Sequence, residues 1–511
     1  MARSTHILKS SYFDSVVLMR IASQLKKQDD ISEVAMFMGT EGNHDLLAQV
    51  GLTTVKSREA GPQDLIVIVV ADSEERAEST TQDALSMLTD RNAGQDNELD
   101  YRPRTLDAAL GFLPDANLAA LSIPGEFAAR EASKCIDKGL NVFLFSDNVA
   151  LADEISLKKK ARRKNLLFMG PDCGTAYING VGLGFANIIK SGRIGCIAAS
   201  GTGLQAVICE LDRLGEGVSH AIGVGGRDLS SEVGGLMTTY SLELLEQDPA
   251  TEVIILLSKP PSADVVEALE ALCSEFSTPV VSCFQGAELP GNTFIQTATL
   301  DEAAATAVCR ANGREHVPVP FNLPDRISDL LEERGNKAAG KRVVGLFTGG
   351  TLAKEAQLLL SKGLGPVAKS FEEHAGHIVV DLGDDQYTIG RPHPMISPEI
   401  RTEKLIELSE TGDLADCGVI LVDLVLGKGS HLDPAQELVE SIETLRKRRQ
   451  LSAEIVAVVI GTPEDPQDIA AQIRVLAAAD ITVFRSNSEA ARYVAMLAAP
   501  ACRENYMKEE S

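Results

Sequence analysis

The stretch "GCIAASGTGLQAVICELDRLG" (195–215) decides the fold, because an apolar strand runs into Ser-Gly-Thr-Gly and then into a helical pattern. A second stretch, "RVVGLFTGGTLAKEAQLLLSKG" (342–363), repeats the arrangement further along the chain. A short apolar run, a glycine loop and an amphipathic segment in this order are typical of strand–loop–helix units in parallel sheets. Both stretches therefore predict α/β domains.

The same alternation continues along most of the chain. Short apolar runs such as "LIVIVV" (65–70), "NVFLF" (141–145) and "LLFMG" (166–170) are separated by helical patterns such as "EFAAREASKCIDKG". Strand and helix repeated this often predict doubly wound parallel sheets covered by helices on both faces. The predicted fold class is α/β.

Changes in composition suggest boundaries. The polar segment 85–104 predicts a loop, and around 186–192 the chain passes from one αβ unit to the next. Residues 310–341 hold prolines and many charges, which predicts an interdomain linker with a short helix. The parts on either side of this linker follow the same order of strands and glycine loops, so we interpret them as a degenerate repeat.

Charge and cysteine content exclude several classes of function. The net charge of −25 argues against a nucleic-acid surface and against docking to an anionic membrane, although it also serves simple solubility. The nine cysteines include no CxxC pair, so no disulfide framework or zinc site is predicted, and Cys196 and Cys283 are expected to be buried free thiols. The N-terminal residues lack a signal-peptide pattern and no apolar run reaches the length of a membrane span, so a cytoplasmic location is expected.

Both glycine loops have the features of an anion site. Glycine lets the backbone approach a ligand closely, and the following helix offers unpaired first-turn N–H groups and the positive end of its dipole. Together these features favour phosphate or a developing oxyanion, and Thr348 adds a further hydroxyl. The alternative is that each Gly-Thr pair merely caps its helix. The predicted phosphate-binding residues are Ser200, Gly201, Thr202, Gly203, Gly349, Gly350 and Thr351. No lysine follows either loop in the Walker arrangement, so a Walker-type NTPase is not predicted.

Other chemistry-bearing residues lie in glycine-rich stretches at predicted strand ends. Arg227, in "GVGGRDLSSEVGG" (223–235), can bind phosphate or carboxylate with two N–H groups, or can form a surface ion pair with Asp228 or Glu232. The loop 381–396, "DLGDDQYTIGRPHPMI", suits proton transfer or carboxylate binding, although a solvated acidic loop is the alternative. Its candidate residues are Asp381, Asp384, Asp385, Arg391 and His393, and the segment 423–434 adds Asp423, Lys428 and His431. The histidines show no metalloenzyme spacing, so no metal site is predicted.

Several of these motifs resemble a known superfamily. "ARRKNLLFMGPDCGTAYI", "GRIGCIAASGTGLQAV" and "GVGGRD" resemble the α subunit of succinyl-CoA synthetase, and residues 121–149 resemble its CoA-binding domain. "FDSVVLM", "LFSDNV", "GGRDLS", "DLGDDQYTIGRPHPMI" and "GKGSHLDP" are closer to one branch, the FdrA family, over nearly the whole chain. The resemblance implies a Rossmann-like CoA-binding-type domain followed by two flavodoxin-like domains. The predicted boundaries are 1–190 for the first domain, 191–312 for the second, 313–341 for the linker and 342–511 for the third.

The chain also departs from the synthetase. There, one helix start from each of two subunits holds a phosphohistidine, whereas here both helix starts belong to one polypeptide. The phosphorylated histidine is expected after "PVVSCF", but this chain has no His between 220 and 316. No segment is typical of an ATP-grasp domain, and the N-terminal region lacks a dinucleotide-type glycine fingerprint. These departures argue against ATP-driven CoA ligation by this chain alone.

The FdrA resemblance implies a function in allantoin breakdown. The family is associated with carbamoyl transfer, in which oxalurate and phosphate give oxamate and carbamoyl phosphate with partner subunits. In that interpretation the helix starts hold phosphate, Arg227 or Arg391 holds the substrate carboxylate, and His393 with Asp384 or Asp385 transfers the proton. No cofactor is then required, and the expected partners are phosphate, a small carboxylate substrate, co-encoded subunits and further copies of the chain. The alternatives are an acyl-CoA synthetase subunit that uses CoA and ATP with a separate ATP-grasp chain, and a non-catalytic metabolite-binding subunit.

Overall fold

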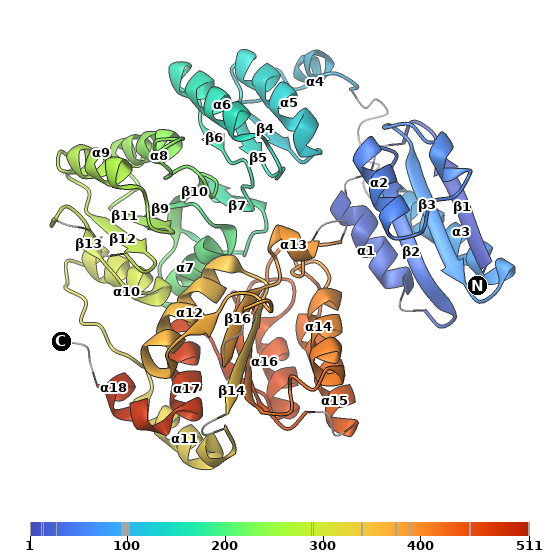
Figure 1. Cartoon of the computed structure of the whole chain (residues 1–511). Coiled ribbons are helices and arrows are strands. Elements are labelled where there is room, and N and C mark those ends of the chain that lie inside the picture. The colour runs from blue at the N-terminus through green and yellow to red at the C-terminus, as the bar shows by residue number, and fades with distance from the viewer. Residues whose placement is uncertain are drawn as a thin grey trace. The chain divides into compact units, whose positions relative to one another are not determined.

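The computed structural model describes residues 2–508 except 12, 14, 27, 94–102, 288, 290, 339–340, 374–375, 389–390 and 449–450. The chain divides into two compact units (Figure 1). The first comprises Met1–Pro114 and Asp385–Ser397, and the second comprises Asp115–Asp384 and Pro398–Ser511. Among the described residues, no helix combines the length and the apolar character needed to cross a membrane.

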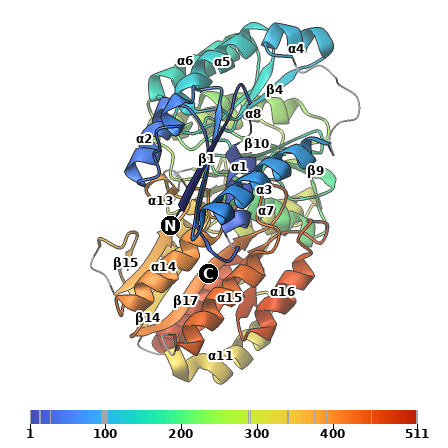
Figure 2. The same ribbon diagram turned by 90° about the vertical axis from the view of Figure 1, so that its right-hand side faces the viewer.

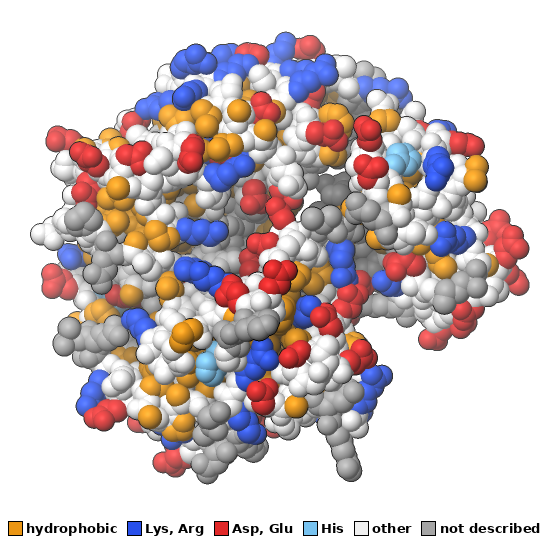
Figure 3. All heavy atoms as spheres, in the orientation of Figure 1, with side chains coloured by type: hydrophobic (Ala, Val, Ile, Leu, Met, Phe, Trp, Pro, Cys, Tyr) orange, Lys and Arg blue, Asp and Glu red, His pale blue; other side chains and the backbone are white. Residues whose placement is uncertain are grey.

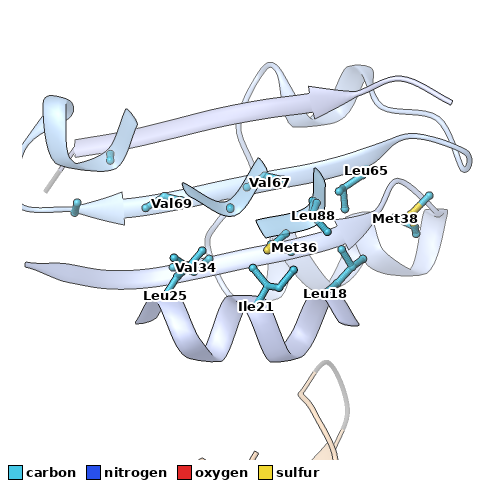
Figure 4. Close-up of a cluster of buried hydrophobic side chains, with 13 residues drawn as sticks. Leu18, Ile21, Leu25, Val34, Met36, Met38, Leu65, Val67, Val69 and Leu88 are labelled. Carbon is cyan, nitrogen blue, oxygen red and sulfur yellow. The ribbon is translucent and has the colours of Figure 1, made fainter. Parts of the chain in front are cut away.

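The first unit is built on an antiparallel sheet. Its strands lie in the order β1 (Ala2–Leu8), β3 (Leu65–Ala71) and β2 (Ile31–Met38), with both outer strands antiparallel to β3. Figure 4 shows Leu18, Ile21 and Leu25 of α1 pointing toward β2 and β3. The other face of the sheet packs against Leu47 and Leu52, so β3 is buried on both faces. The helices of this unit are α1 (Ser15–Lys26), α2 (Glu41–Gln49), α3 (Glu74–Ala93), α4 (Leu106–Phe112) and α13 (Asp385–Thr388), with the short helix η1 (Ser57–Glu59).

The expectation of one Rossmann-like domain over 1–190 is therefore wrong for its first 114 residues. The apolar run 65–70 is the central strand of an antiparallel sheet, and burial on both faces gives it the composition of a parallel strand. Its neighbours β1 and β2 carry polar residues and do not stand out in the sequence. The predicted loop at 85–104 is also wrong up to Ala93, because α3 continues to that residue; residues 94–102 lie outside the described part of the chain.

A small parallel sheet opens the second unit. It holds β4 (Leu118–Leu121), β5 (Asn141–Leu144) and β6 (Phe168–Met169) in this order, with α5 (Gly125–Asp137) and α6 (Leu151–Arg163) between the strands. The Rossmann-like expectation is thus met only by a three-stranded parallel sheet. The next strands, β7 (Thr175–Ile178) and β8 (Val181–Gly184), pair with the following sheet, which therefore begins before the predicted boundary at residue 191.

The second sheet is mostly parallel. Its order is β13 (Ile295–Gln296), β12 (Val280–Phe284), β11 (Val253–Ser258), β9 (Ser191–Ala198), β10 (Val218–Gly223), β7 and β8, of which β7 and β8 run antiparallel at one edge. Its helices are α7 (Gly201–Arg213), α8 (Leu236–Gln247), α9 (Ala263–Cys273) and α10 (Leu300–Ala311). The first parallel strand, β9, lies between β10 and β11, so the chain winds in both directions from β9. Cys196 and Cys283 are buried free thiols within this sheet, as predicted.

The third sheet repeats this plan with six parallel strands. Their order is β15 (Val367–Ala368), β16 (His377–Asp381), β14 (Arg342–Phe347), β17 (Cys417–Val425), β18 (Glu454–Ile460) and β19 (Thr482–Phe484). Its first strand, β14, lies between β16 and β17. The two doubly wound flavodoxin-like sheets predicted from the sequence are therefore confirmed. In each sheet the topological switch point, where open α/β folds bind ligands, falls at the strand that precedes a glycine loop.

Helices cover both faces of the third sheet. In Figure 2, α14 (Glu399–Glu410), α15 (Pro434–Lys447) and α16 (Ile469–Ala478) lie over one face. The other face packs against α12 (Gly350–Leu364) and α17 (Asn487–Ala498). The predicted linker contains α11 (Pro324–Ala338), which contacts α17 and β17 and so belongs to this domain for part of its length. The chain continues through η2 (Pro500–Cys502) and α18 (Arg503–Met507).

Candidate functional site

The two glycine loops meet at the starts of α7 and α12. Ser200 caps α7, because its Oγ accepts a hydrogen bond from the backbone N–H of Gly203 at 3.3 Å. The Thr351 hydroxyl, in the first turn of α12, donates to the same oxygen of Ser200. The cap of one helix is therefore joined to the first turn of the other.

The packing between the two helix starts is reciprocal. A Cβ atom added to Gly203 would lie 2.7 Å from Cγ2 of Thr351, and one added to Gly349 would lie 2.7 Å from Oγ1 of Thr202. Only glycine fits without displacement at these two positions. The glycine of each helix start lies against the threonine of the other helix start. The structure thus brings together all seven residues that the sequence nominated for phosphate binding.

This arrangement concentrates hydrogen-bond donors. The first-turn N–H groups of an α-helix have no acceptor within the helix, and here two such turns lie side by side. The positive ends of both helix dipoles add to the same region. Backbone donors held in place by two rigid helices suit an anion such as phosphate or an oxyanion.

Thr348 has a structural role instead of a ligand-binding one. Its backbone N–H donates to Asp423 Oδ1 at 2.7 Å, and its hydroxyl donates to Asp423 Oδ2 at 3.0 Å. Arg401 Nη2 donates to the same carboxylate at 2.8 Å, and all three residues are buried. The interpretation of the Thr348 hydroxyl as a ligand donor is therefore wrong, because Asp423 uses it to hold the strand end of β14 against β17.

Asp381 is a carboxylate at the start of α12. It is the last residue of β16, and a Cβ atom added to Gly350 would lie 2.5 Å from its Oδ2. Burial raises the pKa of Asp381 to about 6, although the hydrogen bond that its Oδ1 accepts from the N–H of Gly383 at 2.9 Å acts to lower it. A carboxyl group with a pKa near neutrality can exchange a proton under physiological conditions.

Gln285 directly follows β12, the strand after which the synthetase resemblance implies a phosphorylated histidine. It is buried and donates from Nε2 to the backbone oxygen of Thr351 at 3.1 Å. Its amide side chain joins the second sheet to the first turn of α12. Gln285 therefore holds the helix start in place, and the sequence between 220 and 316 contains no histidine that could carry a phosphoryl group.

The residues predicted for proton transfer (His393, Asp384 and Asp385) and Arg391, predicted to bind the substrate carboxylate, are divided between the two compact units. Asp385, Arg391 and His393 belong to the unit that contains residues 1–114, whereas Asp384 belongs to the unit with the helix starts. Burial lowers the pKa of His393 to about 4, so its ring is neutral at pH 7. Its Nδ1 accepts a hydrogen bond from the N–H of Met395 at 3.2 Å. A neutral imidazole is a weak proton donor, which argues against His393 as the general acid; the roles of the other three stay predictions.

Arg227 contacts α6 instead of the surface acids considered for it. Its Nε lies 2.7 Å from Glu154 Oε2, and its Nη2 donates to the backbone oxygen of Val149 at 2.8 Å. Neighbouring Asp228 is fully buried and pairs with Lys158 at 2.7 Å. These bonds join the loop after β10 to the small parallel sheet, so the suggested ion pairs with Asp228 or Glu232 are not the ones that form. Substrate binding by Arg227 stays a prediction.

Comparisons with known proteins agree with this architecture. A family model described as "AllF, heavy metal-associated domain" matches residues 1–103, and one described as "CoA-ligase" matches residues 346–497. The chain is 35% identical over 503 residues to "Uncharacterized protein YahF" of Escherichia coli K12, covering 94% of this chain and 96% of that protein. The chain belongs to the FdrA family.

More distant similarity reaches the CoA ligases. The malate–CoA ligase subunit alpha of Methylorubrum extorquens is 28% identical over 220 residues, which are 40% of this chain and 73% of that protein. The ADP-forming succinate–CoA ligase subunit alpha of Aquifex aeolicus is 28% identical over 181 residues, 34% of this chain and 58% of that protein. This FdrA-family chain is therefore a member of the succinyl-CoA synthetase superfamily and has the fold of an acyl-CoA ligase-type protein.

The N-terminal match raises the question of a metal. Soft heavy metals are held by cysteine thiolates in proteins. The first cysteine of this chain is Cys135, so the matched residues 1–103 contain none. One of their histidines, His44, bonds through Nε2 to the backbone oxygen of Ala60 at 3.0 Å. The residues of this FdrA-family domain do not fit a heavy-metal site, and no chemical step is assigned to one.

Sequence reasoning missed Gln285 among the residues that contact the helix starts. It names Asp381 as a candidate of its loop but assigns it no role, although an acid at the carboxyl end of a parallel strand is a signal for the ligand-binding edge. Gln285 gave no such signal, because its importance depends on a hydrogen bond to a helix 66 residues away in the sequence.

Proposed function

We propose that this protein catalyses phosphate-dependent acyl transfer between the starts of α7 and α12. The observation that carries the proposal is the reciprocal contact of two glycine-threonine helix starts, each at the switch point of its sheet. Fixed donors aimed at developing negative charge stabilise a transition state by about 3 kcal/mol each. Holding phosphate in line with an acyl carbon contributes further through proximity.

In the version closest to the relatives, the acyl donor is an acyl-CoA. A phosphate oxygen forms a bond to the thioester carbonyl carbon, the C–S bond breaks, and the products are an acyl phosphate and CoA. The helix starts would hold the phosphate, and Asp381 would give the proton that the departing thiolate takes up. CoA is a product in this direction and a substrate in the reverse direction, in which a separate partner chain would use ATP. The names of the malate–CoA and succinate–CoA ligase subunits support this version.

A second version has a carbamoyl group as the transferred acyl group. The absence of a histidine between 220 and 316 fits this version as it fits the first, because phosphorolysis makes an acyl phosphate without phosphorylating the enzyme. Phosphate would attack the carbamoyl carbon of oxalurate, the C–N bond would break, and the oxamate nitrogen would take up a proton. The FdrA resemblance links the family to this reaction. Both versions share one phosphate site and one type of product.

One experiment tests both versions. The protein and its co-encoded partner chains are incubated with phosphate and hydroxylamine, which traps acyl and carbamoyl phosphates as hydroxamates or hydroxyurea. Succinyl-CoA, malyl-CoA or oxalurate is added in separate reactions. Product that depends on phosphate and falls at least about tenfold in Thr202→Val supports the proposal. Absence of phosphate-dependent product with all three substrates would contradict it.

A further inference from the structure

Three lysines gather beside the start of α12, outside the helix contact itself. Lys259 directly follows β11, Lys369 directly follows β15, and Lys354 lies in the second turn of α12. They come from three separate elements of the second unit. Lys354 is half-buried, and its pKa is lowered by burial and by the charges of Lys369 and Lys259. The charges of Lys259 and Lys369, whose side chains are exposed, therefore both act on Lys354.

Hydrogen bonds and strand pairing fix this cluster, named here the lysine cluster, to the candidate site. Ser258, next to Lys259, accepts from the N–H of Gln285 at 3.2 Å, and Gln285 in turn donates to Thr351 in the first turn of α12. On the other side, β15 pairs in parallel with β16, whose last residue Asp381 lies against Gly350. The lysine cluster thus lies at the same edge of the two sheets as the helix starts.

The lysine cluster lacks a protein counter-ion. None of its three ammonium groups is within ion-pair distance of a carboxylate in the described part of the chain. Glu373 accepts a hydrogen bond from the backbone N–H of Lys369, and the charge of Lys259 lowers the pKa of Asp381 by less than burial raises it. Figure 3 shows Lys and Arg side chains over the region where α7 and α12 lie in Figure 1.

Such a cluster is unusual in a chain of net charge −25, where acids are plentiful partners. Like charges held together cost free energy unless an anion offsets them. Lysine binds phosphate as a compact point charge, and three lysines match the charge of a phosphate dianion better than that of a carboxylate.

We propose that the lysine cluster binds a second phosphate group, so that the site accepts a diphosphate ligand with one phosphate at the helix starts and the other at Lys259, Lys354 and Lys369. This inference rests on the proposed phosphate site and extends it to ligands with two phosphates. A diphosphate would compete with phosphate for the helix starts and would inhibit acyl transfer.

Isothermal titration calorimetry on the full chain tests the proposal with two probes. Methylenediphosphonate carries two phosphate-like groups, and methylphosphonate carries one. We expect the wild type to bind the diphosphonate at least about tenfold more tightly, because hydrogen bonds between charged groups are the strong ones. The double variant Lys259→Met/Lys369→Met should lose most of this preference and retain its affinity for methylphosphonate. Lys447→Met is the matched control, because Lys447 is exposed and pairs with Glu443 on α15.

Three outcomes would overturn the proposal. These are equal binding of both probes by the wild type, an unchanged preference in the lysine variant, and binding of phosphonoacetate as tight as that of the diphosphonate, which would assign the cluster to carboxylates. Failure of the underlying phosphate site is distinguished by Thr202→Val/Thr351→Val. If this variant binds methylphosphonate as the wild type does, the helix starts do not hold the first phosphate, whatever the lysine variant shows.

Discussion

Replacing Gly203 by alanine tests the contact between the two helix starts, because the expected sign is opposite to the usual one. Glycine-to-alanine substitution within a helix ordinarily stabilises by roughly 0.5–1 kcal/mol. Here the new Cβ atom would lie 2.7 Å from Cγ2 of Thr351, a short side chain tied to Ser200 by its hydroxyl. Overpacking of this kind costs about 1–3 kcal/mol. The difference between the two ranges is about 0–2.5 kcal/mol, and we expect a net destabilisation near its middle, about 1–2 kcal/mol.

Differential scanning calorimetry measures the effect. A loss of about 1–2 kcal/mol lowers the unfolding temperature of a domain of this size by roughly 2–8 °C. The companion change Thr351→Ser removes Cγ2 and keeps the hydroxyl, leaving Cβ at 3.2 Å and Oγ1 at 3.4 Å as the nearest atoms. On the Thr351→Ser background, Gly203→Ala should therefore become neutral or stabilising.

The control is Gly42→Ala in α2, where an added Cβ would meet no atom within 4 Å. It should raise the unfolding temperature of the first unit slightly. If Gly203→Ala stabilises the protein as Gly42→Ala does, and if Thr351→Ser does not change its effect, the two helix starts are not in contact and the reasoning fails.

Three further predictions concern other parts of the structure. Because the pKa of Asp381 is raised in the folded state, its contribution to stability is complete below pH 3.8 and is lost as the pH rises through about 6. Asp381→Asn should therefore stabilise the protein above pH 7 by about 1–3 kcal/mol and flatten the pH profile of the unfolding temperature between pH 4 and 7. A profile unchanged from wild type would contradict this. Thr348→Val should destabilise the third sheet by about 1–3 kcal/mol in thermal unfolding, because it removes the hydroxyl that donates to the buried carboxylate of Asp423. A neutral effect would mean that this hydroxyl bond does not form. Ile21→Ala should destabilise the first unit by about 2–5 kcal/mol and leave phosphate binding by calorimetry unchanged, and a change in phosphate affinity would argue against the independence of that unit.

The sequence revealed what depends on local pattern. Strand, glycine loop and helix occur in order at 195–215 and at 342–363, and the spacing of small and apolar residues in these stretches needs no distant partner to be recognised. Both doubly wound sheets and both helix starts follow from it. The sequence predicts the contact between Gly203 and Thr351 only as a shared phosphate site, because the synthetase resemblance implies that two such helix starts hold one group.

What the sequence did not reveal depends on pairing over long distances. The direction of β1 and β2 relative to β3 is set by connections through helices, and a strand buried on both faces has the same composition in either direction. The same holds for β7 and β8, which join the second sheet across a predicted boundary. The residue types of Arg227 and Thr348 suit anions, but the sequence does not reveal that Glu154 and Asp423 contact them within the fold; substrate binding by Arg227 stays a prediction.

Direct phosphate binding tests the central claim most directly. Isothermal titration calorimetry with inorganic phosphate compares the wild-type chain with Thr202→Val/Thr351→Val, which removes two of the three hydroxyls at the helix starts and keeps that of Ser200. We predict that the wild type binds phosphate and that the variant, with an unfolding temperature near that of wild type, binds it at least about tenfold more weakly. Equal affinity of the two proteins for phosphate would contradict the assignment of the phosphate site to the two helix starts.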